Sequence, residues 1–174
     1  MKKVLVLFAV IIMITGYSTK VMAQATENTA AAAKIVTPLS ITETSSLHFG
    51  TMAILAGTPG TCVLSTQGTR TQTGGVNLSV QAPAASNAAY NVSGAVNTTY
   101  GITLPSTITV TSGGANMTIN SLLARTASAG TNGLTGTLST SGTDNFTVGG
   151  TLNVAAGQAT GIYTGTFDVT VAYN

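Results

Sequence analysis

Apolar and polar residues alternate along most of the chain, which is the pattern of strands that bury only one face. The clearest examples are Val76-Asn77-Leu78-Ser79-Val80, Ile108-Thr109-Val110-Thr111 and Phe146-Thr147-Val148. Residues that favour turns separate such runs, as in Gly57-Thr58-Pro59-Gly60 and Gly149-Gly150. We predict short strands at 34–43, 46–53, 61–67, 75–82, 88–96, 99–111, 115–123, 134–140, 145–155 and 161–173.

A succession of short strands joined by turns is typical of an all-β fold, and we predict an immunoglobulin-like antiparallel β-sandwich. The composition agrees with this prediction. From Gln24 onward, 44 of 151 residues are Thr or Ser, and the β-branched Thr favours extended backbone. Only Asn120 to Arg125 favours a helix, and residues 127–133 are predicted to form a loop. So many strands leave little room for helical crossovers, which argues against a parallel α/β fold.

The first 23 residues have the order of a secretory signal peptide: Lys2 and Lys3, an apolar run from Val4 to Ile14, and a polar stretch from Gly16 to Lys20 that leads to Val21-Met22-Ala23. As a helix the apolar run would be about 16 Å long, too short for a bilayer core of roughly 30 Å. We expect cleavage after Ala23 or Ala25. The mature chain would then have a flexible extension at 24–33 and a single sandwich domain at 34–174. It would be exported through the periplasm to the cell surface, a fimbrium or the medium, without direct membrane insertion after cleavage.

Charged residues are scarce, with six Lys and Arg against four Asp and Glu in the whole chain. Three of the lysines lie in the predicted signal peptide, so the remainder has a net charge of −1. Binding to nucleic acid or to anionic lipid depends on clustered cations. The three cations of the remainder, Lys34, Arg70 and Arg125, are scattered along the sequence, so we exclude both nucleic acid and anionic lipid as partners.

Groups suited to catalysis are equally few. Cys62 is the only cysteine, so no intrachain disulfide can form; the thiol is either a small buried side chain, a reactive group or half of an intermolecular bridge. The only histidine, His48, is typical of a packed or surface residue in a strand. Asp144 and Asp168 are predicted to be solvated. The chain has no zinc-ligand spacing, calcium loop or phosphate-binding loop. We expect no enzymatic activity, no catalytic residue, no cofactor and no metal.

The last fourteen residues carry the strongest functional signal. Gly161 is followed by an alternating run whose odd positions are mostly large and apolar, up to the penultimate Tyr173. Such a run spans roughly 45 Å as a strand, and it could simply be a long core strand that ends the domain. It also resembles the C-terminal motif of subunits in chaperone–usher pili.

That resemblance implies an incomplete sandwich whose missing strand is supplied by another molecule. An incoming strand would satisfy the unpaired N–H and C=O groups of an open sheet edge. The implied partners are further copies or related subunits, together with a periplasmic chaperone and an outer-membrane usher. The residues predicted to form the subunit interface are Gly161, Tyr163, Phe167, Val169, Val171, Tyr173, Ile35, Leu39 and Ile41.

The start of the mature chain offers a candidate donor strand within residues 24–41. Its alternate positions from Ala31 to Ile41 form one modestly apolar face. The apolar residues of the 24–33 extension are all alanine, and burying Ala in place of Val or Leu forfeits about 1 to 2 kcal/mol per site. The donor is therefore either this extension or the following strand at 34–43.

A second resemblance covers nearly the whole mature chain. It rests on Ile35 to Ile41, Leu47 to Gly50, Ala56 to Thr61, Tyr100 to Pro105, Val148 to Leu152 and Gly161 to Asn174. These segments are similar to the bacterial family catalogued as domain of unknown function 4402, whose members are exported and β-rich. The resemblance implies a fold without an established activity.

Two functions remain open at this point. The first is an exported structural subunit of a fimbria-like surface assembly, joined by donor-strand exchange. The second is a free-standing secreted or surface adhesin, or a carbohydrate-binding domain. The predicted loop at 126–133 contains no aromatic residue that would mark it as a sugar-binding loop, which ranks the second function lower.

Overall fold

The computed structural model describes residues 24–174, and the predicted signal peptide at 1–23 lies outside the described residues. Inter-residue contacts assign Lys34 and the residues before it to one unit, and Ile35–Asn174 to another. Residues 24–34 have exposed side chains and no regular secondary structure. The unit from Ile35 onward holds all the strands described below.

Residues 35–174 form twelve strands and no helix, and every strand pairing is antiparallel. This confirms the predicted all-β antiparallel sandwich. The strands are β1 (Ser40–Ser45), β2 (Met52–Ile54), β3 (Gly60–Leu64), β4 (Arg70–Gly74), β5 (Val76–Leu78), β6 (Ala88–Ser93), β7 (Thr99–Thr103), β8 (Thr107–Ser112), β9 (Ala115–Thr126), β10 (Thr135–Thr137), β11 (Thr143–Val154) and β12 (Thr170–Tyr173).

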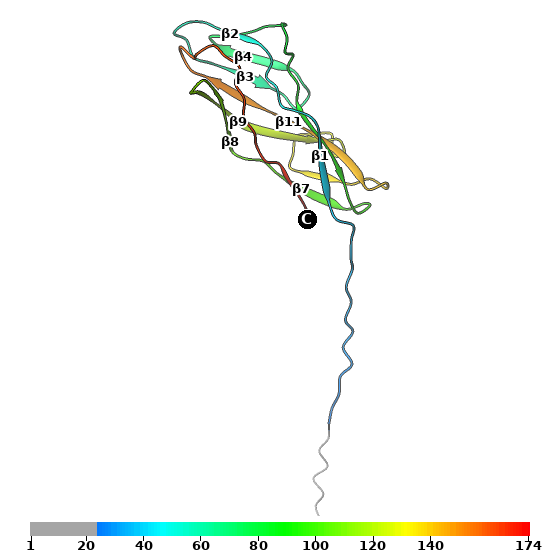
Figure 1. Ribbon diagram of the computed structural model, residues 1–174. Coiled ribbons are helices and arrows are strands. Elements are labelled where there is room, and N and C mark those ends of the chain that lie inside the picture. The colour runs from blue at the N-terminus through cyan, green and yellow to red at the C-terminus, as the bar shows by residue number, and fades with distance from the viewer. Residues whose placement is uncertain (1–23) are drawn as a thin grey trace, which may run out of the picture. The chain divides into compact units, whose positions relative to one another are not determined.

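The long strand β11 organises the larger sheet (Figure 1). One of its edges pairs with β6 along the first half and with β3 along the second half, while the other edge pairs with β9. β1 extends the sheet beyond β6, β4 extends it beyond β3, and β8 pairs with β9. A three-stranded sheet, β10-β7-β12, and a two-stranded sheet, β2-β5, complete the fold.

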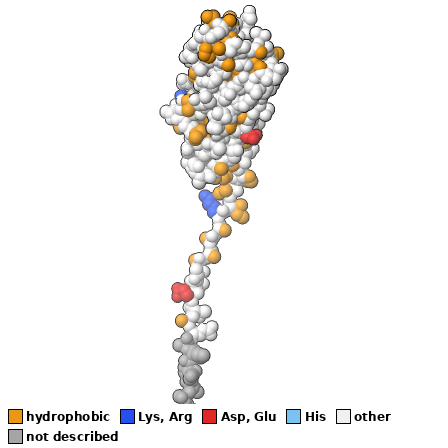
Figure 2. Space-filling model, turned by 90° about the vertical axis from the view of Figure 1, so that its left-hand side faces the viewer, with side chains coloured by type: hydrophobic (Ala, Val, Ile, Leu, Met, Phe, Trp, Pro, Cys, Tyr) orange, Lys and Arg blue, Asp and Glu red, His pale blue; other side chains and the backbone are white. Residues whose placement is uncertain are grey.

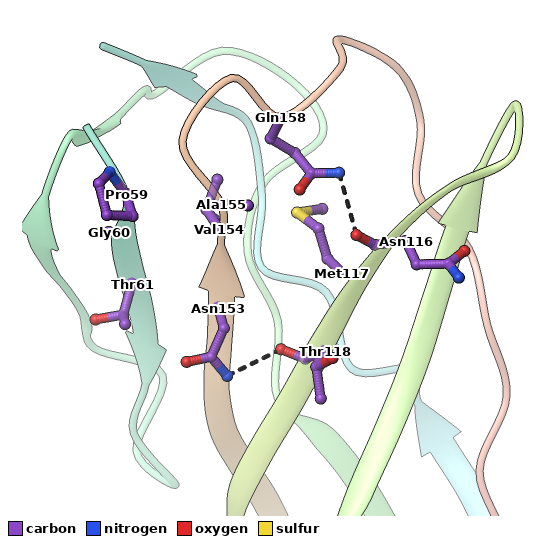
Figure 3. Close-up of a pocket in the computed structure, with 10 residues that line it drawn as sticks. All are labelled: Pro59, Gly60, Thr61, Asn116, Met117, Thr118, Asn153, Val154, Ala155 and Gln158. Atoms are coloured by element: carbon purple, nitrogen blue, oxygen red, sulfur yellow. Dashed lines mark hydrogen bonds between the residues drawn. The ribbon is translucent and has the colours of Figure 1, made fainter. Parts of the chain in front are cut away.

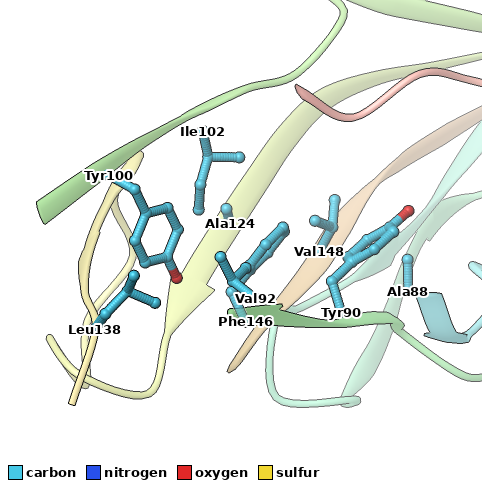
Figure 4. Packing of buried hydrophobic residues seen from close by; sticks show 9 residues of the cluster. All are labelled: Ala88, Tyr90, Val92, Tyr100, Ile102, Ala124, Leu138, Phe146 and Val148. Carbon is cyan, nitrogen blue, oxygen red and sulfur yellow. The ribbon is translucent and has the colours of Figure 1, made fainter. Parts of the chain in front are cut away.

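Two groups of buried side chains form the interior. The first core cluster consists of Ala88, Tyr90, Val92, Tyr100, Ile102, Ala124, Leu138, Phe146 and Val148 (Figure 4). The rings of Tyr90 and Phe146 stack within it, with centroids 5.0 Å apart. The second core cluster consists of Phe49, Cys62, Leu64, Val76, Ile108, Ile119, Leu152 and Val154. β9 and β11 contribute to both clusters, so these two strands connect the ends of the sandwich.

Arg70, on β4, stabilises a region with little regular structure. Its guanidinium donates hydrogen bonds to the backbone carbonyls of Phe49 (2.9 Å), Thr51 (3.2 Å) and Ser79 (2.7 Å). Phe49 and Thr51 precede β2 and Ser79 follows β5, so these carbonyls lie at one end of the short β2-β5 pair. One charged side chain thus takes the place of the ladder bonds that longer strands would make.

Several predicted strand boundaries were wrong. The strand predicted at 34–43 begins only at Ser40, and the one predicted at 46–53 is reduced to a bridge at His48 and to β2. The strand predicted at 99–111 is divided into β7 and β8, and β4 was not predicted. The helix favoured for Asn120 to Arg125 is instead part of β9, whereas residues 127–133 lie between β9 and β10, as expected for a loop.

The visible surface of the folded unit carries few charged side chains (Figure 2). From Ile35 onward the charged residues are Glu43, Arg70, Arg125, Asp144 and Asp168. Within residues 24–174, no helix is long and apolar enough to cross a membrane.

Candidate functional site

The C-terminal strand segment, residues 161–173, runs antiparallel to residues 100–111. At its end, β12 pairs with β7 from Thr170↔Thr103 to Tyr173↔Tyr100, and nearer its start Thr164 forms a bridge with Thr111. Between these pairings it passes Pro105, which has no N–H to donate to a ladder. The predicted strand at 161–173 is therefore confirmed as regular structure only at Thr170–Tyr173.

The alternation predicted for this segment is present. Phe167, Val169, Val171 and Tyr173 are half-buried and pack against the first core cluster, whereas the residues between them are exposed. None of residues 161–174 is fully buried. The apolar side of the segment consequently touches the core but still keeps part of its surface in water.

The outer edge of the segment is open. β12 ends the order of its three-stranded sheet, and within residues 24–174 the ladder bonds of β12 go to β7 alone. β1 ends the larger sheet in the same way, because it pairs only with β6 among the described strands. Leu39, just before β1, and Ile41, on β1, pack against the same core cluster as Phe167 and Val171. Two open edges therefore flank one apolar cluster.

Tyr173 connects these two edges at one end. Its hydroxyl donates to the backbone carbonyl of Thr37 (2.7 Å) and accepts from the backbone N–H of Ala95 (2.6 Å). The side chain of Tyr173 also lies close to Gly94, where a Cβ would collide with the tyrosine hydroxyl. The penultimate tyrosine thus fixes the end of the C-terminal strand against the residues that precede β1.

Three predicted interface residues lie elsewhere. Gly161 passes Ser112, and a Cβ there would meet the serine hydroxyl. The hydroxyl of Tyr163 donates to the carbonyl of Ala159 (2.7 Å) and accepts from the Gln158 amide (2.7 Å). Ile35 is 96 % exposed. The structure brings Leu39, Ile41, Phe167, Val169, Val171 and Tyr173 together at the open edges, and leaves out Gly161, Tyr163 and Ile35.

Sequence reasoning missed the role of Asp144, which was predicted to be solvated. Its half-buried carboxylate accepts hydrogen bonds from the Tyr100 hydroxyl (2.9 Å) and the Ser128 hydroxyl (2.6 Å). Burial raises the pKa of Tyr100, and the hydrogen bond to Asp144 and its negative charge raise that pKa further. Asp144 thus satisfies a buried phenol and fixes the loop after β9, a role that only the tertiary structure shows.

The groups considered for catalysis differ in their exposure to solvent. Cys62 has no exposed surface, which confirms the interpretation as a small buried side chain. Burial raises the pKa of its thiol, and the nearby charge of Arg70 opposes this shift only in part. His48 is exposed, and its Nδ1 accepts a hydrogen bond from the Gly50 N–H (2.8 Å). In the part of the chain that the structure describes, no three His, Cys, Asp or Glu side chains gather as metal ligands would.

Comparison with protein families gives one match. The family model described as "Domain of unknown function (DUF4402)" matches residues 39–173. The chain belongs to this family. The DUF4402 match begins at Leu39 and ends at Tyr173, so it includes both open edges and confirms the family resemblance drawn from the sequence. A comparison with curated proteins finds no match.

Proposed function

We propose that this DUF4402 protein is an exported structural subunit of a fimbria-like surface assembly whose copies are joined by donor-strand exchange. An extended segment of one copy would pair with the open edge of the C-terminal strand segment of the next. The observation that carries the proposal is the half-buried apolar row of Phe167, Val169 and Val171 beside an unpaired strand edge.

The chemistry of the two edges supports this proposal. Soluble proteins protect exposed edge strands with charges, prolines or bulges. Asp168 is the only charged residue of the C-terminal strand segment, and Glu43 is the only one on β1. Among the other edges, β4 carries Arg70 and the polar residues Thr71 to Thr73. β1 carries a register shift typical of a β-bulge between Glu43 and Ser45. The edge of the C-terminal strand segment, with the half-buried apolar row beside it, is therefore the one best suited to accept an apolar strand.

The structure narrows the choice of donor. Residues 40–45 already pair with β6, and Leu39 and Ile41 already pack against their own core, so residues 39–45 are not free for a neighbour. Residues 24–36 have exposed side chains and no ladder bonds within the described part of the chain. Ile35 is the largest fully exposed apolar side chain among them and is the expected anchor.

Export through the periplasm belongs to the same proposal. A subunit with an open apolar edge would require a temporary partner before assembly, which is the role of a periplasmic chaperone, and an outer-membrane usher would then exchange that partner for a second subunit. β-strand addition of this kind gains affinity from main-chain hydrogen bonds and specificity from alternate side chains.

Cysteine cross-linking tests strand exchange directly. Ile35→Cys in one tagged copy and Val169→Cys in a second copy should form a mixed disulfide dimer when the purified proteins are mixed and oxidised. Cys62 does not interfere, because it is fully buried. The measurement is the yield of the mixed dimer on a non-reducing gel.

Ile162→Cys provides the matched control, because Ile162 is exposed on the same segment but lies outside the half-buried row. The proposal expects a much lower yield of mixed dimer when Ile35→Cys is paired with Ile162→Cys. Equal yields with the two partners, or monomers under all conditions, would rule out docking of the N-terminal segment at this edge.

A further inference from the structure

A separate hollow opens at the other end of the sandwich, where β3, β9 and β11 meet the turn that follows β11 (Figure 3). Its volume is about 490 Å³, and it is a shallow depression that is largely open to solvent. None of its ten lining residues is charged. The polar ones are Thr61, Asn116, Thr118, Asn153 and Gln158.

Two amide side chains in this hollow are held in fixed orientations. Gln158 donates from its Nε2 to the Asn116 carbonyl (3.2 Å) and to the Tyr163 hydroxyl (2.7 Å). Both N–H groups of that amide are thereby used, which leaves its carbonyl oxygen as an acceptor. Asn153 donates from its Nδ2 to the Thr118 carbonyl (3.1 Å), and within residues 24–174 its Oδ1 has no hydrogen-bond partner.

Polar residues also continue across the outer face of the sheet from this hollow. Thr61, Asn153 and Thr118 are cross-strand neighbours on β3, β11 and β9. The same row extends to Thr73 on β4 and Thr109 on β8, and the hydroxyls of Thr61 and Thr73 lie 2.7 Å apart. The result is an uncharged row of hydroxyl and amide groups, with the hollow beside it.

This chemistry identifies one class of ligand. Phosphates and carboxylates are most often bound by Lys or Arg, and nucleobases most often stack on an aromatic ring; neither residue type lines the hollow. Neighbouring hydroxyls of a sugar can each donate to an amide oxygen and accept from an amide N–H or a hydroxyl. Met117, Pro59 and Val154 supply apolar surface for the C–H groups of a sugar ring.

We propose that this hollow binds a neutral carbohydrate, with Asn153 and Gln158 as the binding residues and Tyr163 as a positioning residue. The proposal is independent of strand exchange, because the binding residues lie away from the open edges. Weak single sites of this kind would gain avidity if many copies were displayed together.

The test uses the chain from Gln24 onward on an array of neutral oligosaccharides that contain mannose, galactose, glucose or N-acetylglucosamine, each printed with and without a terminal sialic acid. We expect saturable binding of a neutral oligosaccharide. Asn153→Ala and Gln158→Leu should each weaken it by about ten-fold, as expected for the loss of one or two hydrogen bonds. Tyr163→Phe should weaken it less, because it frees the Gln158 amide without removing it.

Asn91→Ala is the matched control, since Asn91 is an exposed amide on β6, away from the hollow, and should bind as the unchanged chain does. Chemical shifts of the side-chain amides of Asn153 and Gln158, followed by NMR during titration with the same oligosaccharide, should move in a saturable manner. The proposal is overturned if no neutral oligosaccharide binds at millimolar concentration, if the sialylated forms bind more tightly, or if folded Asn153→Ala and Gln158→Leu bind as well as Asn91→Ala.

Discussion

Two tyrosine hydroxyls, on the paired residues Tyr100 of β7 and Tyr173 of β12, hold segments around the first core cluster in place. Tyr100 is fully buried and donates to Asp144, which also binds Ser128 after β9. Tyr173 is half-buried and joins the end of the chain to Thr37 and Ala95. In a protein without disulfides in its described part, such hydrogen bonds replace covalent links between segments that are distant in the sequence.

The ionisation of Tyr100 should make the protein less stable in alkali. In the unfolded chain a tyrosine titrates near pH 10, whereas burial and Asp144 raise the pKa of Tyr100 in the folded state. Between the two pKa values the unfolded state loses a proton that the folded state keeps. The free energy of unfolding should therefore fall above about pH 10, by up to about 1.4 kcal/mol per pH unit, while the contribution is fully present below that pH.

Urea unfolding at a series of pH values from neutral to alkaline measures this slope. In Tyr100→Phe the free energy of unfolding should fall less steeply with pH. Some pH dependence should remain, because burial also raises the pKa of Tyr90. Tyr163→Phe leaves the Tyr100–Asp144 pair intact and should keep the slope of the unchanged protein. Parallel curves for the unchanged protein and Tyr100→Phe would show that Tyr100 does not control the alkaline transition.

The C-terminal strand segment depends on close contact with β8 where the ladder is interrupted. Gly165 lies against the backbone of β8, and a Cβ at this position would be 2.5 Å from the Thr109 carbonyl oxygen. Gly161 has a different neighbour, since a Cβ there would meet the hydroxyl of Ser112, which can rotate away. The two glycines of the segment therefore differ in how much they restrict its path.

Gly165→Ala should separate the segment from β8 and destabilise the protein by about 1 to 3 kcal/mol, the usual cost of overpacking. Gly161→Ala is the matched substitution and should change the free energy of unfolding by only about 0.5 kcal/mol. The midpoints of urea unfolding, at equal slope, measure both changes. If both variants lost the same stability, the contact between Gly165 and β8 would not be what holds the segment.

At the scale of strands, alternation in the sequence was a sound guide where a strand has one apolar face. It predicted Ala88–Ser93 and Phe146–Val148 because inward and outward side chains differ there. It could not predict β4, whose sequence Arg70-Thr71-Gln72-Thr73-Gly74 is polar on both faces. It also favoured a helix at Asn120 to Arg125, where pairing with β11 overrides local propensity and a bulge places Ser121 at a positive φ of 50°.

The candidate site was predictable to a similar extent. The half-buried row from Phe167 to Tyr173 follows directly from the alternation of apolar and polar residues. Every second residue of this run is large and apolar, and these are the side chains that the structure half-buries. Tyr163 occupies an apolar position of the same alternating run, but its hydroxyl lies beside Gln158. The chain pairs with the end of β8 at this point and does not lie over the first core cluster. The bond between Tyr173 and Thr37 joins residues far apart in the sequence, and no local pattern encodes it.

The molecule as a whole combines low charge with two open strand edges. With five charged residues from Ile35 onward, copies of the folded unit repel one another weakly. Of the two cations among them, Arg70 is occupied by three backbone carbonyls. Approach of a second chain would therefore meet little electrostatic resistance, and under the proposed strand exchange it would dock at the open edge beside the apolar row.

If the proposed docking is correct, a peptide should stabilise the folded unit in trans. We expect a peptide of residues 26–37 to raise the melting temperature of a variant lacking residues 24–33. Binding to the folded state alone would add about 2.7 kcal/mol when the peptide is at a hundred times its dissociation constant. In a domain of this size that corresponds to a rise of several degrees.

The same peptide with Ile35→Asp should have no effect, because a charge would have to be buried against the apolar row. Equal shifts with both peptides, or none with either, would mean that the open edges do not accept this segment.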